Sequence, residues 1–374
     1  MTRTAIQLIS TGGFYGAERA LLELAVFLSE RGWDSRIVAL EGKGAPELVR
    51  RAAEAGVSAV AFSDGTRVGA GALLRRLRAT LAAHSHAIVH SHGYKPDILL
   101  AALRTRRRLG CIATCHTWYS DTLKMKLFER LDKRVLRGFD HVVAVSDEIR
   151  TELVTSGVAP GKTMVIDNGI SPPTVDPEAR ASVRTEFGIA PQERLIVQIG
   201  RLAQSKRNDL LLEAAARLNA TIPVKVLLVG DGSEKDALAE KARMLGIATH
   251  VTFCGYRNDA QRILAAADAL ALTSNKEGLP IVILEAMALG CPIITTAVGA
   301  VPTVLRSKEN AWIVPIDDLR ELTSALTEML SDQALAGERA ERAKRAFYLR
   351  FARDVMGVRY LDLYERTWSA RGWS

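Results

Sequence analysis

The sequence is poor in the features that mark several other protein classes. It has only four cysteines in 374 residues, and no two of them form a Cys-x-x-Cys pair, so neither a disulfide framework nor a cysteine-based metal site is expected. We interpret these thiols as buried in a reducing compartment: Cys111, Cys115, Cys254 and Cys291. No apolar run reaches the roughly 20 residues of a membrane-spanning helix, and the short apolar start does not resemble a signal peptide. We therefore expect a soluble, cytoplasmic protein.

A second absence concerns metal binding. The chain contains no Asp-x-Asp, the usual metal clamp for a nucleoside diphosphate, so positive side chains would have to neutralise such a ligand. The pairs His84/His86 and His90/His92 alternate as on an extended segment, but no cluster of carboxylates or cysteines accompanies them. We expect neither a metal ion nor another cofactor.

The charge and composition are those of a globular, basic protein. The formal net charge is +8, with 48% hydrophobic and 25% charged residues, so an anionic partner is expected: nucleic acid, a phosphorylated substrate or an acidic membrane face. The sequence signatures of nucleic-acid-binding modules are absent, and we therefore expect no nucleic acid.

Short apolar runs alternate with helix-length segments, which predicts parallel strands with helices on both faces of a sheet. In the first half these runs are Ala5–Ile9, Arg36–Leu40, Val57–Phe62, Ala87–His90, Cys111–Cys115, Val142–Val145 and Met164–Ile166. The Pro-rich stretch Ser171–Pro177 is typical of a linker. The alternation then restarts with Leu195–Ile199, Val224–Val229, Val251–Phe253, Ala269–Leu272, Pro292–Thr295 and Trp312–Val314. The prediction is two doubly wound α/β domains, residues 1–170 and 171–350, with a ligand in a cleft between them.

The most informative stretch is residues 274–287. A polar turn containing Glu277 follows an apolar run, and Pro280 stands where a helix could begin, since its missing N–H costs nothing there. The following helix would be apolar almost all round, and hence buried, yet it carries Glu285 in its middle. Two carboxylates around a helix N-terminus indicate a ligand site. The alternative is a solvated loop residue and a paired structural acid.

A basic loop follows the first strand of the second domain. Arg201 and Lys206 lie five residues apart in it, and Gly200 allows close backbone approach. Arginine can hold a phosphate through two hydrogen bonds, and lysine acts as a mobile point charge. A solvated basic loop is the alternative. In the same cleft as Glu277 and Glu285, these cations would hold a diphosphate while the carboxylates hold sugar and ribose hydroxyls.

Two other glycine-rich segments do not match phosphate-binding motifs. Gly12–Gly16 lacks the G-x-G-x-x-G spacing of a dinucleotide fingerprint. Gly157–Thr163 is one residue short of a P-loop and precedes a strand, whereas a P-loop follows one. We therefore expect neither type of site.

Taken together, these residues resemble family 4 of the retaining glycosyltransferases, of the bacterial surface-polysaccharide or lipid-linked glycan type. The specific part is the E-x7-E pattern of Glu277 and Glu285 combined with Gly200–Leu202 and Lys206. Weaker matches cover nearly the whole chain: Gly16–Arg19, Cys115–Trp118, Val143–Ser146, Asn168–Ile170 and Gly230–Gly232. The resemblance implies the GT-B fold, in which two Rossmann-like domains face each other across a cleft. It also implies that a C-terminal helix, residues 351–374, crosses back to the first domain.

The resemblance implies roles for individual residues. Arg201 and Lys206 would bind the donor diphosphate and stabilise the departing nucleotide, while Glu277 would hold donor-sugar hydroxyls. The remaining donor-binding residues would be Gly13, Gly200, Gly278, Leu279, Pro280, Ile281 and Glu285, the last on the ribose. The acceptor side would include Gly16, His92, His116 and Trp118. Of these, His116 would take part in catalysis near the reacting carbon, where it would donate to a sugar hydroxyl or orient the acceptor.

The implied reaction moves a hexosyl group from a UDP- or GDP-sugar with retention of configuration. A front-face route is implied, in which the leaving phosphate takes the acceptor proton, so neither glutamate need be a nucleophile and no metal is required. We expect the base to be read by backbone around Tyr256–Asp259. A GT-B nucleotide-sugar epimerase and a basic, non-catalytic nucleic-acid or membrane-surface binding protein remain alternatives, whereas a phosphorylase would need a much longer chain.

One basic stretch of the first domain bears on the acceptor. Between Ala101 and Asp140 the chain has ten Lys/Arg residues against four Asp/Glu, interleaved with aromatic and aliphatic residues. Such a surface could rest on anionic lipid on the inner face of the membrane, each cation contributing about 1 kcal/mol. An ordinary helix with a solvated basic face is the alternative. We favour a lipid-linked or polysaccharide glycan as acceptor, with a small soluble acceptor still open.

Overall fold

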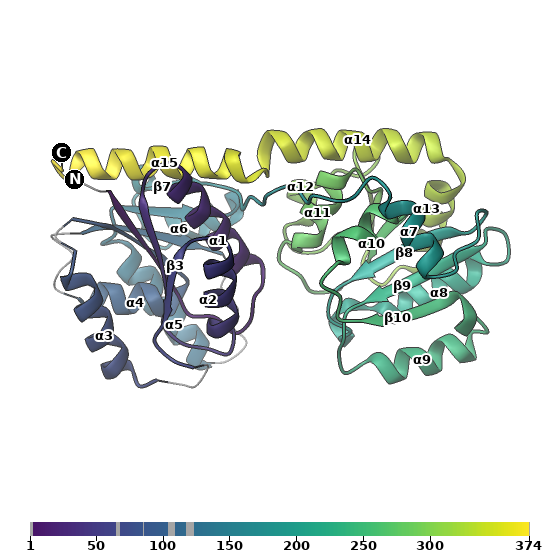
Figure 1. Cartoon of the computed structure of the whole chain (residues 1–374), viewed down its shortest axis with the longest axis horizontal. Coiled ribbons are helices and arrows are strands. Elements are labelled where there is room, and N and C mark those ends of the chain that lie inside the picture. Colours follow the sequence, from purple (N-terminus) through teal and green to yellow (C-terminus); the bar gives the residue numbers. More distant parts are fainter. Residues whose placement is uncertain (1–2, 65–67, 85, 104–108, 117–122, 374) are drawn as a thin grey trace. The chain divides into compact units, whose positions relative to one another are not determined.

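The computed structural model of the chain describes residues 3–64, 68–84, 86–103, 109–116 and 123–373. Its contacts divide the chain into two units. The first comprises Met1–Ser171 together with Arg350–Ser374, and the second comprises Pro172–Leu349. Each unit is a parallel β-sheet covered by helices (Figure 1), which confirms the predicted alternation of strands and helices in both halves of the chain.

The first unit contains a seven-stranded parallel sheet in the order β3-β2-β1-β4-β5-β6-β7. Its strands are β1 (Thr4–Ile9), β2 (Asp34–Ala39), β3 (Ser58–Ala61), β4 (Ile88–His92), β5 (Gly110–Cys115), β6 (His141–Ala144) and β7 (Thr163–Val165). Its helices are α1 (Gly16–Glu30), α2 (Ala45–Glu54), α3 (Ala70–Ala82), α4 (Tyr94–Ala102), α5 (Leu123–Leu136), α6 (Asp147–Thr155) and α15 (Arg353–Ala370).

Both faces of this sheet are buried because alternate side chains of a strand point to opposite sides. On β1, Ala5 packs against residues of α1 and α15, whereas Ile6 and Leu8 pack against residues of α3, α4 and α5. The strands β1 and β5 are therefore apolar over most of their length, as their sequence runs predicted, whereas β4 carries the buried polar residues His90, Ser91 and His92.

The last helix of the chain completes the first unit. The helical tail breaks at Phe351 and Ala352, where α14 ends and α15 begins, and Ile170 bonds to both sides of the break: Ile170 N to Phe351 O at 3.0 Å, and Arg353 N to Ile170 O at 2.8 Å. The apolar residues of α15 then pack beside α1 (Figure 1). Val358, also on α15, lies outside the face of this helix that packs against α1, and its side chain is 55% exposed.

A chain of buried polar side chains lies beneath α15. Gln7 of β1 donates to Tyr364 Oη at 3.0 Å, and the same hydroxyl lies 2.6 Å from His90 Nδ1. His90 Nε2 lies 2.7 Å from Thr114 Oγ1, which in turn lies 2.8 Å from Tyr360 Oη. Each polar group in this apolar layer thus has a partner, which removes most of the cost of its burial.

The second unit contains a six-stranded parallel sheet in the order β10-β9-β8-β11-β12-β13. Its strands are β8 (Arg194–Ile199), β9 (Val224–Val229), β10 (Val251–Gly255), β11 (Ala269–Leu272), β12 (Ile293–Thr296) and β13 (Trp312–Val314). Its helices are α7 (Ala179–Glu186), α8 (Asn208–Leu218), α9 (Lys235–Met244), α10 (Ala260–Ala266), α11 (Ile281–Leu289), α12 (Val301–Val304), α13 (Leu319–Ser331) and α14 (Gln333–Arg350).

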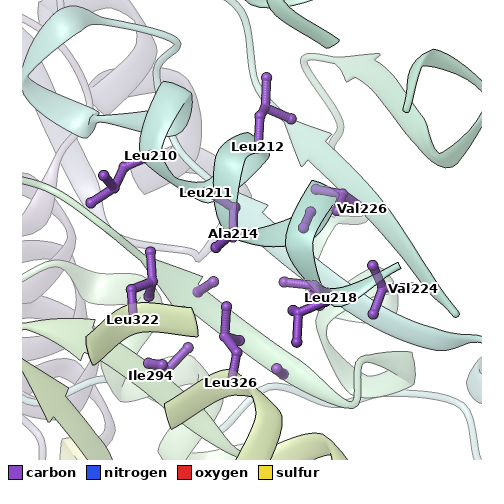
Figure 2. Packing of buried hydrophobic residues seen from close by; sticks show 14 of the residues in the cluster. Leu210, Leu211, Leu212, Ala214, Leu218, Val224, Val226, Ile294, Leu322 and Leu326 are labelled. Carbon is purple, nitrogen blue, oxygen red and sulfur yellow. The ribbon is translucent and has the colours of Figure 1, made fainter. Parts of the chain in front are cut away.

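One core of the second unit lies between its sheet and helices α8 and α13. Figure 2 shows Leu211, Leu218 and Ile294 of this cluster, which meet Leu322 and Leu326 of α13. None of the helices within the described ranges has the length and hydrophobicity that crossing a bilayer requires.

The contact between α1 and α15 leaves no room for a side chain at Gly357, because a Cβ there would lie 2.4 Å from the Phe27 ring. We expect Gly357→Leu to lower the free energy of unfolding by about 1–3 kcal/mol through overpacking. Gly337 of α14 is the matched control, since a Cβ there meets nothing within 4 Å. Gly337→Leu should be neutral or stabilising by up to about 1 kcal/mol. Urea denaturation measures both, and equal effects would contradict this packing.

The buried histidines predict a loss of stability on mild acidification. Burial lowers the pKa of His90 to about 3 and that of His92 well below its ordinary value. Both are therefore neutral in the folded chain, whereas the unfolded chain protonates them near pH 6.5. Because the unfolded state then binds more protons, stability should fall below pH 6.5 by up to about 1.4 kcal/mol per pH unit for each histidine.

Urea denaturation at pH 7, 6 and 5 measures this slope. We expect His90→Gln to lower stability at pH 7 but to reduce the slope. His250→Gln, at a side chain of the second unit that is 39% exposed, gives for comparison the effect of the same substitution outside this buried cluster. A wild-type stability that does not change between pH 7 and pH 5 would refute the neutral assignment.

Candidate functional site

Two glycine-rich loops meet at the carboxyl ends of β8 and β9 in the second unit. The Gly200 amide donates to Val229 O and the Leu202 amide to Asp231 O, each at 2.9 Å. A Cβ at Gly230 would lie 2.1 Å from Gly200 O, and glycine is required there because its φ is +136°. The two backbones can therefore lie side by side, which holds the loop bearing Arg201 and Lys206 in place.

The structure brings Lys206 and Glu277 into direct contact. The Lys206 ammonium forms an ion pair with Glu277 Oε1, and Ser274 Oγ donates to the same oxygen at 2.9 Å. Both charged side chains are largely buried, with 17% and 15% of their surfaces exposed. The sequence predicts a phosphate ligand for Lys206 and a sugar ligand for Glu277, but not the ion pair between the two side chains.

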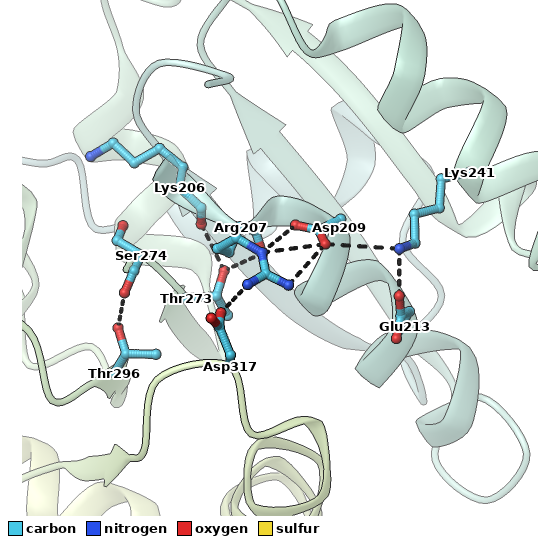
Figure 3. A network of polar contacts seen from close by, with 9 residues as sticks. All are labelled: Lys206, Arg207, Asp209, Glu213, Lys241, Thr273, Ser274, Thr296 and Asp317. Atoms are coloured by element: carbon cyan, nitrogen blue, oxygen red, sulfur yellow. Dashed lines mark hydrogen bonds and ion pairs between the residues drawn. The ribbon is translucent and has the colours of Figure 1, made fainter. Parts of the chain in front are cut away.

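The backbone of the Lys206 loop is tied to the end of β11. Thr273 Oγ1 donates to Lys206 O at 3.0 Å and to Arg207 O at 2.8 Å (Figure 3). Arg207 itself is left-handed, with φ of +49°, and its guanidinium pairs with Asp209 and Asp317 (Figure 3). No sequence motif signalled Arg207, because neither its conformation nor a partner 110 residues away leaves a local pattern. Residues 203–209, excluding Lys206, also line a cavity of about 550 Å³.

Helix α11 begins directly after the Glu277 turn. Pro280 is its N-cap residue and Ile281 its first residue. The Ile283 amide donates to Pro280 O at 3.0 Å, so the amides before it in the first turn are the ones that can hold an anion. The turn is fixed by Ala300 N, which donates to Gly278 O at 3.1 Å, and by Gly299, where a Cβ would lie 2.1 Å from Glu277 O. Residues 278–281 therefore lie at the start of a buried helix, as the sequence indicated.

Glu285 and Arg201 have contrasting surroundings. Glu285 is 8% exposed within α11 and accepts a hydrogen bond from Gln261 Nε2 at 2.8 Å. Gln261, on α10, was not predicted, because a single polar residue in a helix gives no signal of its function. Arg201 is exposed, and no described residue forms an ion pair with its guanidinium.

The segment expected to read the base carries a charged cluster. Tyr256 is 72% exposed, and the Arg257 guanidinium binds Asp259 at 2.7 Å and Glu186 at 3.0 Å. Hydrogen bonding from Arg257 holds the pKa of Asp259 well below its usual range. Base recognition by this backbone stays a prediction.

The first unit has a corresponding loop after β1. A Cβ at Gly42 would lie 1.8 Å from Thr11 O, and one at Gly44 would lie 2.6 Å from the backbone of Gly13. The loop containing Gly13 is therefore packed against the loop after β2, a contact that the sequence did not reveal. Gly16 begins α1, whose N-terminus is capped by a bond from Tyr15 N to Glu18 Oε2 at 3.0 Å.

His92 and His116 come together at the carboxyl ends of β4 and β5. His92 Nδ1 lies 3.4 Å from His116 Nε2, and His92 Nε2 lies 3.0 Å from Gln7 Oε1. His116 Nδ1 is buried and has no hydrogen-bond partner within the described part of the chain. Burial lowers the pKa of His116 to about 4, so the ring is neutral at pH 7. Trp118 lies outside the described residues.

A cavity of about 230 Å³ adjoins this histidine pair. Its lining includes Ser10, Gly12 and His92, together with Glu41 and Lys95, which form an ion pair. Nowhere in the described ranges do three or more His, Cys, Asp or Glu side chains form a group that could hold a metal ion.

Comparisons with known proteins identify the family of this chain. Residues 14–172 match the model of Glycosyltransferase Family 4, and residues 180–347 match that of Glycosyl transferases group 1. The N-acetyl-alpha-D-glucosaminyl L-malate synthase of Bacillus anthracis is 27% identical over 284 residues, 74% of each chain. The lipopolysaccharide core biosynthesis glycosyltransferase LpsE of Rhizobium meliloti is 33% identical over 169 residues, which covers 45% of this chain and 49% of LpsE.

The fold agrees with that assignment. HepE of Anabaena, solved in complex with UDP, superimposes with a TM-score of 0.84 over 98% of this chain and 100% of HepE, at 21% sequence identity. HepE was also solved with UDP-glucose. The two parallel sheets with interleaved helices are those of the GT-B fold. The chain therefore belongs to family 4 of the glycosyltransferases.

Proposed function

We propose that this glycosyltransferase moves a hexosyl group from a nucleoside-diphosphate sugar, with UDP as the favoured nucleotide, to a glycan or lipid-linked acceptor. The observation that carries the proposal is the Lys206–Glu277 ion pair at the start of α11. It joins a cation for the donor phosphates and a carboxylate for the donor sugar at a helix N-terminus suited to anions. The HepE complexes with UDP and UDP-glucose support the choice of nucleotide.

The charges of this site suit a leaving diphosphate. In the transition state of glycosyl transfer the leaving group gains negative charge, so cations that already lie there lower the barrier selectively. Arg201 is exposed and has no anionic partner among the described residues, and Lys206 can exchange Glu277 for a phosphate oxygen. With these two cations and the α11 amides, the proposed transfer needs no metal ion.

The environment of the glutamates favours the front-face route. A double displacement needs a carboxylate free to attack the anomeric carbon. Glu277 is engaged by Lys206 and Ser274, and Glu285 is buried and bonded to Gln261. Both are better suited to accept hydrogen bonds from hydroxyls than to form a covalent bond. The acceptor hydroxyl would therefore attack from the side of the leaving phosphate, which takes its proton and gives retention.

The acceptor proposal rests on the relatives and on one helix surface. The names of the relatives mention L-malate in one case and lipopolysaccharide core biosynthesis in the other, so the relatives are named for a small molecule as well as for a glycan. On α5 the side chains of Leu123, Leu127 and Leu131 are 86%, 68% and 40% exposed, and they alternate with exposed Lys126 and Arg130. We propose that this face rests on an anionic membrane that carries the acceptor.

Removal of the Lys206 ammonium tests the donor site. We expect Lys206→Ala to lower turnover by about a hundredfold, because one charge-stabilising group is lost from the transition state. UDP should raise the melting temperature of the wild type but not of this variant. Steady-state transfer and thermal shift measure these effects, and circular dichroism verifies the fold.

The control for this variant is Lys225→Ala, at the amino end of β9, where Lys225 donates to Thr249 O. It should retain both UDP stabilisation and turnover. UDP-, GDP- and ADP-sugars are compared side by side with the wild type. If none raises the melting temperature, or if Lys206→Ala turns over normally, the proposal fails. Turnover of the nucleotide sugar without any acceptor would instead indicate an epimerase.

The membrane proposal predicts binding to vesicles that contain anionic lipid. We expect Leu127→Ser to weaken sedimentation with phosphatidylglycerol-containing vesicles at low salt by about tenfold, since burial of a leucine contributes roughly 1.5–3 kcal/mol. Leu349→Ser is the control, because Leu349 of the second unit is 80% exposed but lies outside this face. Equal losses in the two variants, or equal binding of the wild type to neutral vesicles, would contradict the proposal.

A further inference from the structure

Three hydrogen-bonding steps connect α15 to His116. Tyr364 of α15 contacts Gln7 of β1, Gln7 contacts His92 of β4, and His92 contacts His116 after β5, over distances of 3.0, 3.0 and 3.4 Å. Gln7 and His92 are 0% and 5% exposed, so water does not compete for these bonds. The three strands are neighbours in the sheet. This explains why Gln7 meets His92, 85 positions away, and why His92 meets His116, 24 positions away.

The side-chain amide of Gln7 gives this line a direction. Its Nε2 donates to Tyr364, and its Oε1 faces His92 and can only accept. His92 must therefore carry its proton on Nε2, and its Nδ1 is left as an acceptor. His116 then donates from Nε2 to His92 Nδ1. In a neutral imidazole only one nitrogen carries a proton, so His116 Nδ1 is an acceptor with a free lone pair.

The unpartnered atom of His116 agrees with this direction. The opposite orientation of the Gln7 amide would reverse each bond and leave a proton on the buried, unpartnered Nδ1. An orphaned buried donor is rarer in folded proteins than an under-satisfied acceptor. This direction is thus the one that leaves the less costly atom without a partner.

We infer that Gln7 and His92 are positioning residues that hold His116 as the Nε2-protonated tautomer, so that its Nδ1 accepts a hydrogen bond from a substrate hydroxyl. The inference rests on the proposed function, because it takes that hydroxyl to belong to the acceptor or the donor sugar. It assigns His116 an accepting role, whereas donation to a sugar hydroxyl was one of the two roles implied by the resemblance. Tyr364 anchors Gln7, so the tautomer depends on a helix far away in sequence.

This line of hydrogen bonds requires that the imidazole rings of His92 and His116 be neutral, and burial keeps both rings neutral. Burial lowers the pKa of His116 to about 4 and holds that of His92 well below its ordinary value, so neither carries a charge at pH 7. No carboxylate lies in the line, so no anion draws a proton onto His92. Gln7 therefore sets the tautomer without charging the ring, in contrast to an aspartate at the same place.

Two-bond proton–nitrogen correlation spectra of histidine-labelled protein test the tautomer directly. In the wild type at pH 7 we expect the His116 pattern of a ring protonated at Nε2 and bare at Nδ1. Gln7→Met should give a mixture of the two tautomers. Tyr360→Phe is the control: it removes a buried hydroxyl at the other end of the polar network, beyond His90, and should leave the His116 pattern unchanged.

Kinetics and a second variant separate positioning from simple destabilisation. Loss of a group that orients a histidine costs about ten- to a hundredfold, so we expect Gln7→Met to lower kcat by that factor at an unchanged donor KM. Gln7→Glu places an anion beside His92 that draws a second proton onto this ring and removes its Nδ1 acceptor, so this variant should restore neither the His116 pattern nor kcat. Tyr360→Phe should not lower kcat.

The two kinds of measurement distinguish failure of this inference from failure of the proposed function. A wild-type His116 protonated at Nδ1 would overturn the inference whatever the enzyme transfers. An unchanged His116 pattern in Gln7→Met would overturn it as well. If no donor and acceptor pair supports transfer, the proposed function fails, while the spectra still decide the tautomer.

Discussion

The ion pair between Lys206 and Glu277 is the interaction on which the second unit is organised. Neither charge could be largely buried alone, since an isolated ion in a protein interior is strongly destabilising. The pair needs both its loops fixed, and the glycine contacts at Gly230 and the bonds from Thr273 provide this. A ligand that presents an anion to the lysine and hydroxyls to the glutamate can replace the pair without leaving either residue uncompensated.

Parallel-sheet topology explains why such sites form in both units. In the second unit, β9, β8 and β11 are neighbours, so their carboxyl-end loops deliver the two glycine turns and the Glu277 turn to one edge. In the first unit the neighbouring strands β1, β4 and β5 bring together Gln7 from within β1, His92 at the end of β4 and His116 directly after β5. Residues remote in sequence become adjacent because each lies on, or directly after, a strand of the same sheet.

The sequence predicted what leaves a local pattern. Every strand of both sheets was expected from its apolar run, and the buried helix with an internal glutamate was expected from residues 281–289. What it could not provide were side-chain pairs across the sheet, such as Gln261 with Glu285, and backbone contacts between loops, such as Gly44 with Gly13. These depend on where two distant segments meet, and neither periodicity nor composition contains that information.

The proposed reaction requires cations in the second unit and an uncharged histidine in the first. In the proposed reaction the leaving diphosphate gains negative charge, so the second unit supplies cations. The sugar carbon gains positive charge, so an imidazolium that acted on the substrate would raise the barrier by repulsion. His116 avoids this because its burial beside two other neutral histidines keeps it uncharged. A neutral ring can still accept a hydrogen bond, but only if its tautomer is fixed. The line of bonds from α15 through Gln7 fixes it, which gives the last helix of the chain a chemical role besides closing the core of the first unit.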